Sequence, residues 1–109
     1  MDQGLKFCGK ILGPGYPAFL VAEIGFNHIG DLELANSMIE SAAENGADAV
    51  KMQTFVAREM ISNTLIADDP DHPGNEIPLY EFFQRYELSR DDYKILIAHA
   101  RTLNIPLFS

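Results

Sequence analysis

The sequence predicts an α/β domain built on a parallel sheet. Residues 19–24 form an almost unbroken apolar run, which is typical of a strand buried on both faces. A segment with helical apolar spacing follows, and residues 49–53 then show a second strand pattern. Another helical segment and a third short apolar run complete the chain. This order defines βαβ units, and it leaves a barrel and an open sheet as alternatives.

Local signals place the first elements. Residues 5–12 lead into the turn-rich stretch 13–17, and this pattern predicts a short β-ribbon. Asp31 is a good N-cap for the first helix, and Asn45 with Gly46 is a common signal for its end. The apolar residues between these signals fall on one helical face: Leu32, Ala35, Met38, Ile39, Ala42 and Ala43.

The second half of the chain begins with a stretch that has no clear pattern, residues 54–78. So long an irregular connection in a compact domain is usually functional or disordered. A short helix is expected at residues 79–86. Ser89 and Asp92 have the spacing of a capping box, so a clearer helix should begin there and end at Asn104. Residues 105–109 have the pattern of a third strand.

The composition is that of an ordinary soluble globular protein, with 109 residues, 47% hydrophobic and 22% charged. Sixteen acidic and eight basic residues give a net charge of -8. This balance argues against a nucleic-acid or membrane partner, because both need a basic patch. No stretch approaches the ~20 apolar residues of a membrane span. The single cysteine, Cys8, excludes an internal disulfide and suits a cytoplasmic location.

Polar side chains interrupt both predicted strands near their carboxyl ends, where functional groups of parallel sheets collect. Glu23 lies near the end of the first strand, and Lys51 and Gln53 near the end of the second. Because side chains alternate with period two, Lys51 and Gln53 share a face, and the three groups are expected to converge. The alternative is a structural Glu23–Lys51 ion pair, with Gln53 as a satisfied core amide.

Turns and solvated loops explain several other polar residues. Asn27 and His28 lie in a tight loop whose geometry they would serve, and Asn75 beside Gly74 has the pattern of a turn residue. The histidines show no recognisable metal-ligand spacing: His28, His72 and His99. An acidic run without an EF-hand pattern is interpreted as a solvated loop: Asp68, Asp69 and Asp71. No metal site is therefore predicted within the chain.

Four segments of the chain carry motifs of one family. AEIGFNHIGD at residues 22–31 and GADAVKMQT at residues 46–54 resemble the AEIGxNHxG and GADAVKxQT signatures of the N-acetylneuraminate (sialic acid) synthase family. Gly74 and Asn75, followed by LYE, are a third match, and LFS at residues 107–109 is similar to the strand before the family's TPF. The order and spacing of all four agree over nearly the whole chain.

The resemblance implies a partial (β/α)8 TIM barrel, of which this chain holds the first two to three βα units. Residues 1–17 would form an N-terminal β-ribbon that closes the bottom of the barrel, and residues 18–109 the N-terminal part of the synthase domain. A whole barrel needs ~250 residues. The chain is therefore expected to be incomplete and inactive alone, and the full-length protein is expected to be a homodimer.

The implied reaction condenses phosphoenolpyruvate with the open-chain aldehyde of N-acetylmannosamine or a related amino sugar and releases phosphate. By the same resemblance, Glu23 is the catalytic residue, a proton-transfer or water-orienting group beside the reacting carbons. Lys51 would hold the carboxylate or phosphate of phosphoenolpyruvate. Gln53 and Asn75 would bind the sugar through hydrogen bonds.

Asn27 and His28 belong to the signature, and we assign them loop shaping and support of the site. The family's divalent metal, Mn or Mg, would be held by two histidines beyond Ser109. Two alternatives to the synthase stay open. One is a Schiff-base aldolase-type barrel with Lys51 as the nucleophile, and the other is a truncated, non-catalytic binding fragment. The acceptor sugar is left undetermined.

Overall fold

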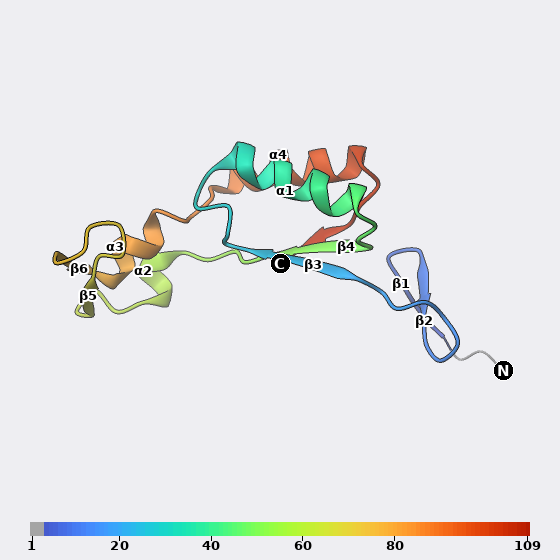
Figure 1. Cartoon of the computed structure of the whole chain (residues 1–109), viewed down its shortest axis with the longest axis horizontal. Coiled ribbons are helices and arrows are strands. Elements are labelled where there is room, and N and C mark those ends of the chain that lie inside the picture. Colours follow the sequence, from blue (N-terminus) through green and yellow to red (C-terminus); the bar gives the residue numbers. More distant parts are fainter. Residues whose placement is uncertain (1–3) are drawn as a thin grey trace.

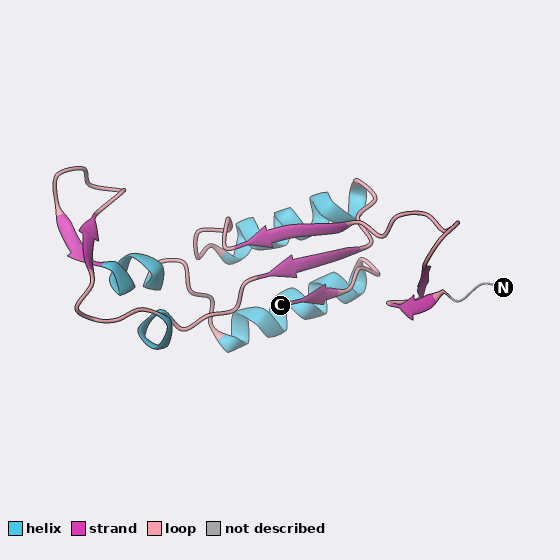
Figure 2. Ribbon diagram, turned by 90° about the horizontal axis from the view of Figure 1, so that it is seen from below, coloured by secondary structure: helices cyan, strands magenta, loops and turns pink. Residues whose placement is uncertain are grey.

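A three-stranded parallel sheet forms the centre of the computed structural model, which describes residues 4–109. Its strands are β3 (Val21–Gly25), β4 (Ala49–Met52) and β7 (Leu107–Phe108), with β4 in the middle. Strands that are consecutive in the sheet are also consecutive in the chain among these three (Figure 2). The predicted α/β class and its parallel pairing are confirmed.

Two helices of 13 residues each cover one face of the sheet, α1 (Leu32–Glu44) and α4 (Arg90–Thr102), as Figure 1 shows. The Asp31 carboxylate accepts hydrogen bonds from the first free N–H groups of α1, and Ser89 and Asp92 form a reciprocal capping box at the start of α4. Both predicted helix starts are therefore confirmed.

The core lies between these helices and the sheet. It consists of apolar side chains that alternate along the strands and recur along the helices. Its fully buried members include Ile39, Val50, Met52 and Leu96. The opposite face of the sheet carries no helix among the described residues, and Val21 on that face is 44% exposed. Side chains on this uncovered face, which we call the open face, can therefore contact a ligand or a further part of a protein.

An N-terminal hairpin lies beyond the amino ends of the sheet strands, in accordance with the predicted ribbon. It pairs β1 (Leu5–Phe7) with β2 (Lys10–Leu12) in antiparallel register. The ring of Phe7 packs edge-on against Phe19 at 5.2 Å and Phe108 at 6.5 Å, measured between centroids. Lys10 forms an ion pair with Asp48. The first three residues of the predicted ribbon segment lie outside the described residues.

The stretch at residues 54–78 contains short regular elements that the sequence pattern did not reveal. They are α2 (Ala57–Met60) and an antiparallel hairpin of β5 (Ile66–Asp68) and β6 (Glu76–Pro78), and α3 (Leu79–Gln84) follows directly. The hairpin lies at the end of the molecule opposite to β1 and β2, so the chain extends over 59 × 27 × 23 Å (Figure 1). Between residues 4 and 109, no helix is long and apolar enough to cross a membrane.

Candidate functional site at the carboxyl ends of β3 and β4

Glu23 and Lys51 are directly opposite each other in the parallel pairing of β3 with β4. The Lys51 Nζ atom lies 3.3 Å from Glu23 Oε2, and the two side chains are 38% and 49% exposed. An ion pair at this exposure contributes about 0–1 kcal/mol to stability. Because this contribution is small, the stability of the sheet depends little on the pair. Both charged groups lie on the open face and remain accessible to a ligand.

Gly25 brings the amide of Gln53 close to this pair. The register of the two strands shifts between Glu23 and Gly25, and Gly25 has a φ of +60°. A Cβ atom placed on Gly25 would lie 3.3 Å from Glu23 Oε1 and 3.6 Å from Gln53 Oε1, so the carboxylate and the amide flank this glycine. The Tyr93 hydroxyl donates to the Gln53 carbonyl at 3.0 Å and holds the strand end in place. The predicted convergence of acid, ammonium and amide is thus present.

Asn27 and His28 shape the loop that follows β3. The Asn27 side chain donates to the Ile24 carbonyl at 2.8 Å. His28 is completely buried, and its Nδ1 atom accepts a hydrogen bond from the Gly30 N–H at 3.0 Å. Burial lowers the pKa of His28, so its imidazole is neutral with the proton on Nε2. These contacts shape the loop, as the sequence predicts, and the support of the site by both residues stays a prediction.

Asn75 is not brought together with the other predicted site residues. It lies in the turn of the β5–β6 hairpin, which stands away from the sheet in Figure 1. Its carbonyl accepts a hydrogen bond from the Asp69 N–H at 2.7 Å, and its own N–H donates to the His72 carbonyl at 3.1 Å. These backbone contacts fix the position of Asn75 within the hairpin, and its role in sugar binding stays a prediction.

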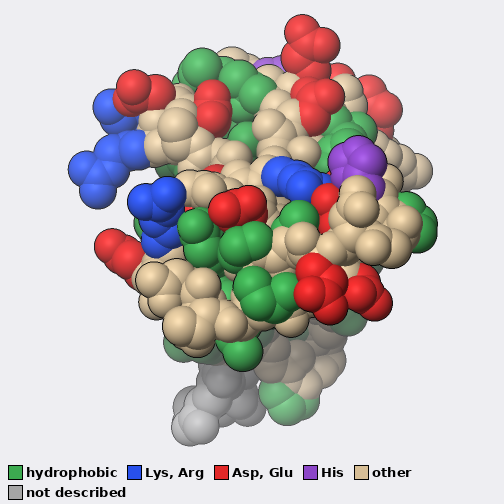
Figure 3. Space-filling view, turned by 90° about the vertical axis from the view of Figure 1, so that its left-hand side faces the viewer, with side chains coloured by type: hydrophobic (Ala, Val, Ile, Leu, Met, Phe, Trp, Pro, Cys, Tyr) green, Lys and Arg blue, Asp and Glu red, His purple; other side chains and the backbone are tan. Residues whose placement is uncertain are grey.

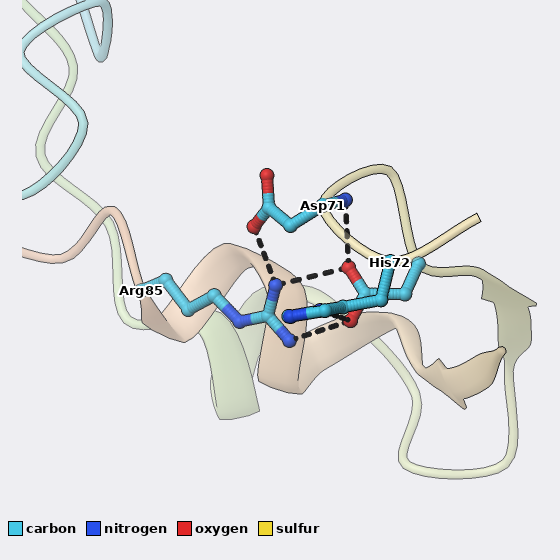
Figure 4. Close-up of polar contacts among 4 residues, drawn as sticks. Asp71, His72 and Arg85 are labelled. Carbon is cyan, nitrogen blue, oxygen red and sulfur yellow. Dashed lines mark hydrogen bonds and ion pairs between the residues drawn. The ribbon is translucent and has the colours of Figure 1, made fainter.

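A buried carboxylate, Asp69, organises that turn (Figure 4). The Asp69 side chain is 3% exposed and accepts from both terminal nitrogens of Arg85, at 3.0 and 2.9 Å. His72 Nδ1 lies 3.0 Å from the same carboxylate, and Asp71 accepts from Arg85 at 2.6 Å. The Arg85 guanidinium holds the pKa of Asp69 well below its usual range.

The interpretation of the acidic run as a solvated loop is therefore wrong for Asp69. Its partner Arg85 lies 16 residues further along the chain, on the turn that ends α3. No local pattern reports a contact of this separation, so the pairing could be found only in three dimensions. Asp68 and Asp71 are exposed, as the sequence predicts.

Sequence reasoning also missed an aromatic cluster beside Gln53. Phe26, Phe55 and Phe83 meet edge-to-face with their centroids 5.9–6.2 Å apart, and Tyr86 lies 5.8 Å from Phe26. The rings come from three segments: the loop after β3, the segment after β4, and α3 with the turn that follows it. Only Phe55 lies in the stretch without a clear pattern, and no local signal connects it with rings that are about 30 residues away in the sequence.

The described residues offer no cage for a metal ion. Between residues 4 and 109, no three histidine, cysteine, aspartate or glutamate side chains come together in a way that could hold one. Figure 3 views the end of the molecule that carries the β5–β6 hairpin, where acidic and basic side chains alternate with hydrophobic ones in small groups. No broad basic patch appears on this face.

Comparison with known proteins identifies the family. The sequence profile of the NeuB family matches residues 38–109. The chain is 38% identical to N,N'-diacetyllegionaminic acid synthase of Legionella pneumophila over 100% of its own length and 32% of that protein. It is 50% identical to human N-acetylneuraminate-9-phosphate synthase over 96% of this chain and 30% of that protein.

A solved structure agrees with these matches. The crystal structure of N-acetylneuraminic acid (sialic acid) synthetase from Leptospira borgpetersenii in complex with citrate superposes with a TM-score of 0.77 at 27% identity. The match covers 99% of this chain and 34% of that one. The chain thus spans about a third of the length of these relatives. On the motif order, the profile match and the shared fold, the chain belongs to the NeuB family.

Proposed function

We propose that this chain forms the first wall of the active site of a nonulosonate synthase, which joins phosphoenolpyruvate to an N-acylated amino-sugar aldehyde in the cytoplasm. The observation that carries this proposal is the Glu23–Lys51 pair, 3.3 Å apart at the carboxyl ends of neighbouring parallel strands. The names of the relatives support the class of product, and they differ in the sugar that is made.

The reaction forms a C–C bond to the aldehyde and a C–O bond to water, and it breaks the C–O bond to phosphate. The enol carbon of phosphoenolpyruvate attacks the aldehyde, water adds to the resulting oxocarbenium-like centre, and phosphate leaves with the bridging oxygen. The Lys51 ammonium holds an anionic group of phosphoenolpyruvate. The Glu23 carboxylate accepts a proton from the attacking water or orients it. Gln53 donates to and accepts from the sugar, with Asn75 as a second sugar contact.

The rest of the site lies on parts of the protein outside this chain. Consecutive strands neighbour each other and both long helices lie on one face of the sheet, an arrangement that a (β/α)8 barrel would continue. The open face, with Glu23 and Lys51, would then face the barrel interior. A divalent metal, Mn or Mg, would take its ligands from later strands, and the full protein would act as a homodimer. The 109 residues alone should not turn over.

The test uses the complete gene product that carries these residues. It is incubated with N-acetylmannosamine, a divalent metal and phosphoenolpyruvate labelled with ¹⁸O at the bridging oxygen. Sugar-dependent phosphate release with the label in phosphate is the expected result, and Glu23→Gln should lower the turnover rate strongly. Label retained in the organic product would contradict C–O cleavage.

Lys51 separates the synthase from a Schiff-base aldolase. An aldolase lysine attacks a carbonyl as a neutral amine, whereas the Lys51 ammonium is paired with a carboxylate. Borohydride treatment of the working enzyme should therefore leave Lys51 unmodified. A covalent substrate adduct on Lys51 would support the aldolase. In a separate assay, clear turnover by the 109 residues alone would contradict the proposal that they form only part of the active site.

A further inference from the structure

An apolar hollow adjoins the polar site and has no role in the chemistry described above. It has a volume of about 460 Å³ and is lined by Phe26, Gln53, Thr54, Phe55, Met60 and Phe83. None of these residues is charged. Gln53 is shared with the candidate site, because its amide also flanks Gly25 opposite the Glu23 carboxylate. The hollow and the reacting groups are therefore neighbours.

The walls of the hollow are held in place. Phe26, Phe55 and Phe83 contact one another edge-to-face, and Phe83 also packs against Phe82 at 5.4 Å. Each ring in such a cluster restricts the others, since edge-to-face pairs have a preferred geometry. The first residue of α2 is tied to the segment after α3 by a hydrogen bond from the Ala57 N–H to the Glu87 carboxylate. The three phenylalanine rings of the wall therefore restrict one another, while Met60 at the edge is 53% exposed.

We infer that this hollow holds the N-acyl group of the acceptor sugar, an assignment that rests on the proposed function. In a 2-acylamino sugar the acyl group is only a few bonds from the aldehyde carbon. If that carbon lies at Glu23 and Lys51, the acyl group must lie next to them. Gln53 can pair with the N–H and C=O of the acylamino group, and the aromatic rings with Met60 surround its alkyl end.

The chemistry of the lining argues against a charged occupant. A phosphate or carboxylate in the hollow would need a cation or several N–H donors, and the lining offers one amide and one hydroxyl side chain. A free ammonium would find no carboxylate in the lining, and its attraction to the aromatic rings would replace only part of its lost hydration. An uncharged alkyl group attached to an amide fits this lining, because the alkyl part needs apolar contacts and the amide needs one polar partner.

The experiment measures kcat/KM of the complete gene product with N-acetyl-, N-propanoyl- and N-butanoylmannosamine and with mannosamine itself. Phe55→Leu and Met60→Ala each enlarge the hollow, so both should raise the ratio of kcat/KM for the butanoyl over the acetyl acceptor. The expected gain is about fourfold for each additional methylene that becomes buried. Mannosamine should be the poorest acceptor for every variant.

Two variants serve as matched controls. Leu65 is 51% exposed against 53% for Met60, and Phe19 forms an edge-to-face pair with Phe7 at 5.2 Å, but neither Leu65 nor Phe19 lines the hollow. Leu65→Ala and Phe19→Leu should therefore leave the ratio unchanged. Because each ratio is internal to one variant, a loss of folded protein cancels from it.

Each outcome bears on a separate claim. If the acceptors release phosphate but neither lining variant changes the ratio, the acyl assignment is wrong while the synthase proposal stands. The same holds if the controls shift the ratio as much as the lining variants. If no N-acylated amino-sugar aldehyde, free or phosphorylated, releases phosphate from phosphoenolpyruvate, the proposed function fails and the assignment fails with it.

Discussion

Replacing Lys51 by Met separates binding of phosphoenolpyruvate from stability of the sheet. Methionine keeps most of the aliphatic length of lysine and removes the charge. The pair with Glu23 is 3.3 Å long and both side chains are more than a third exposed, so its loss should change the free energy of unfolding by less than about 1 kcal/mol. A charge-assisted hydrogen bond to a ligand contributes about 1.5–3 kcal/mol.

The dissociation constant of phosphoenolpyruvate should therefore rise by roughly 10- to 150-fold. The Glu23 carboxylate, left beside an anionic ligand without its partner, should add to this loss. Isothermal titration calorimetry with the complete gene product gives the affinity, and urea unfolding gives the stability. Lys94→Met is the matched control, because Lys94 also forms one ion pair, with Asp91 at 2.9 Å, but lies on α4.

Unchanged affinity in Lys51→Met would refute the role of Lys51 as the anion-binding group. An equal loss of phosphoenolpyruvate affinity in Lys94→Met would show that the effect comes from the change in net charge and not from the position of Lys51. If unfolding free energy falls by several kcal/mol only in Lys51→Met, the ion pair is mainly structural, which is the alternative that the strand pattern left open.

Three further predictions concern the hairpin, the core and the site. The lowered pKa of Asp69 means that its contribution to stability is present above the usual aspartate pKa and is lost as pH falls through the folded value. Amide exchange in the β5–β6 hairpin should therefore accelerate only in strong acid, and Asp69→Asn should accelerate it at neutral pH. Ile39→Ala should lower the free energy of unfolding by about 3 kcal/mol, because Ile39 is fully buried. Ile95→Ala, at a position 49% exposed, should cost less than about 1 kcal/mol in the same urea titration. Gly25→Ala should reduce kcat, since both a positive φ and the nearby carboxylate resist a Cβ atom. Gly46 also has a positive φ, but a Cβ atom added there would have no atom within 4 Å. If Gly46→Ala retains its turnover, the loss in Gly25→Ala comes from the contacts of Gly25 in the site and not from a positive φ alone.

The parts of the fold that the sequence predicts are those set by local signals. Asp31 and Ser89 begin their helices because a side-chain oxygen satisfies free N–H groups a few residues away. The apolar run at residues 19–24 was placed correctly as a strand, although the structure shifts its bounds to Val21–Gly25. Such signals extend over a few residues, and they need no knowledge of the rest of the chain.

The hairpin between residues 54 and 78 shows why the remainder could not be predicted. Its strands have three residues each, too few to display alternation. A contact between Asp69 and Arg85, on either side of the hairpin strand β6, organises the turn between them. For the same reason, only part of the candidate site could be predicted. The alternation of side chains along one strand predicts that Lys51 and Gln53 share a face, whereas the aromatic cluster forms only where three distant segments meet.

The exposure of the Glu23–Lys51 pair bears on how this fold would work in a longer protein. In the chain alone the pair faces solvent, where the attraction between the charges is weak and an anion would be held loosely. Closure of a barrel over the open face would exclude water and strengthen every electrostatic contact there. The same enclosure would leave Lys51 without hydration unless an anion joins Glu23 as its partner. Phosphoenolpyruvate should therefore bind far more weakly to the 109 residues than to the complete gene product, even though Glu23, Lys51 and Gln53 are already in place.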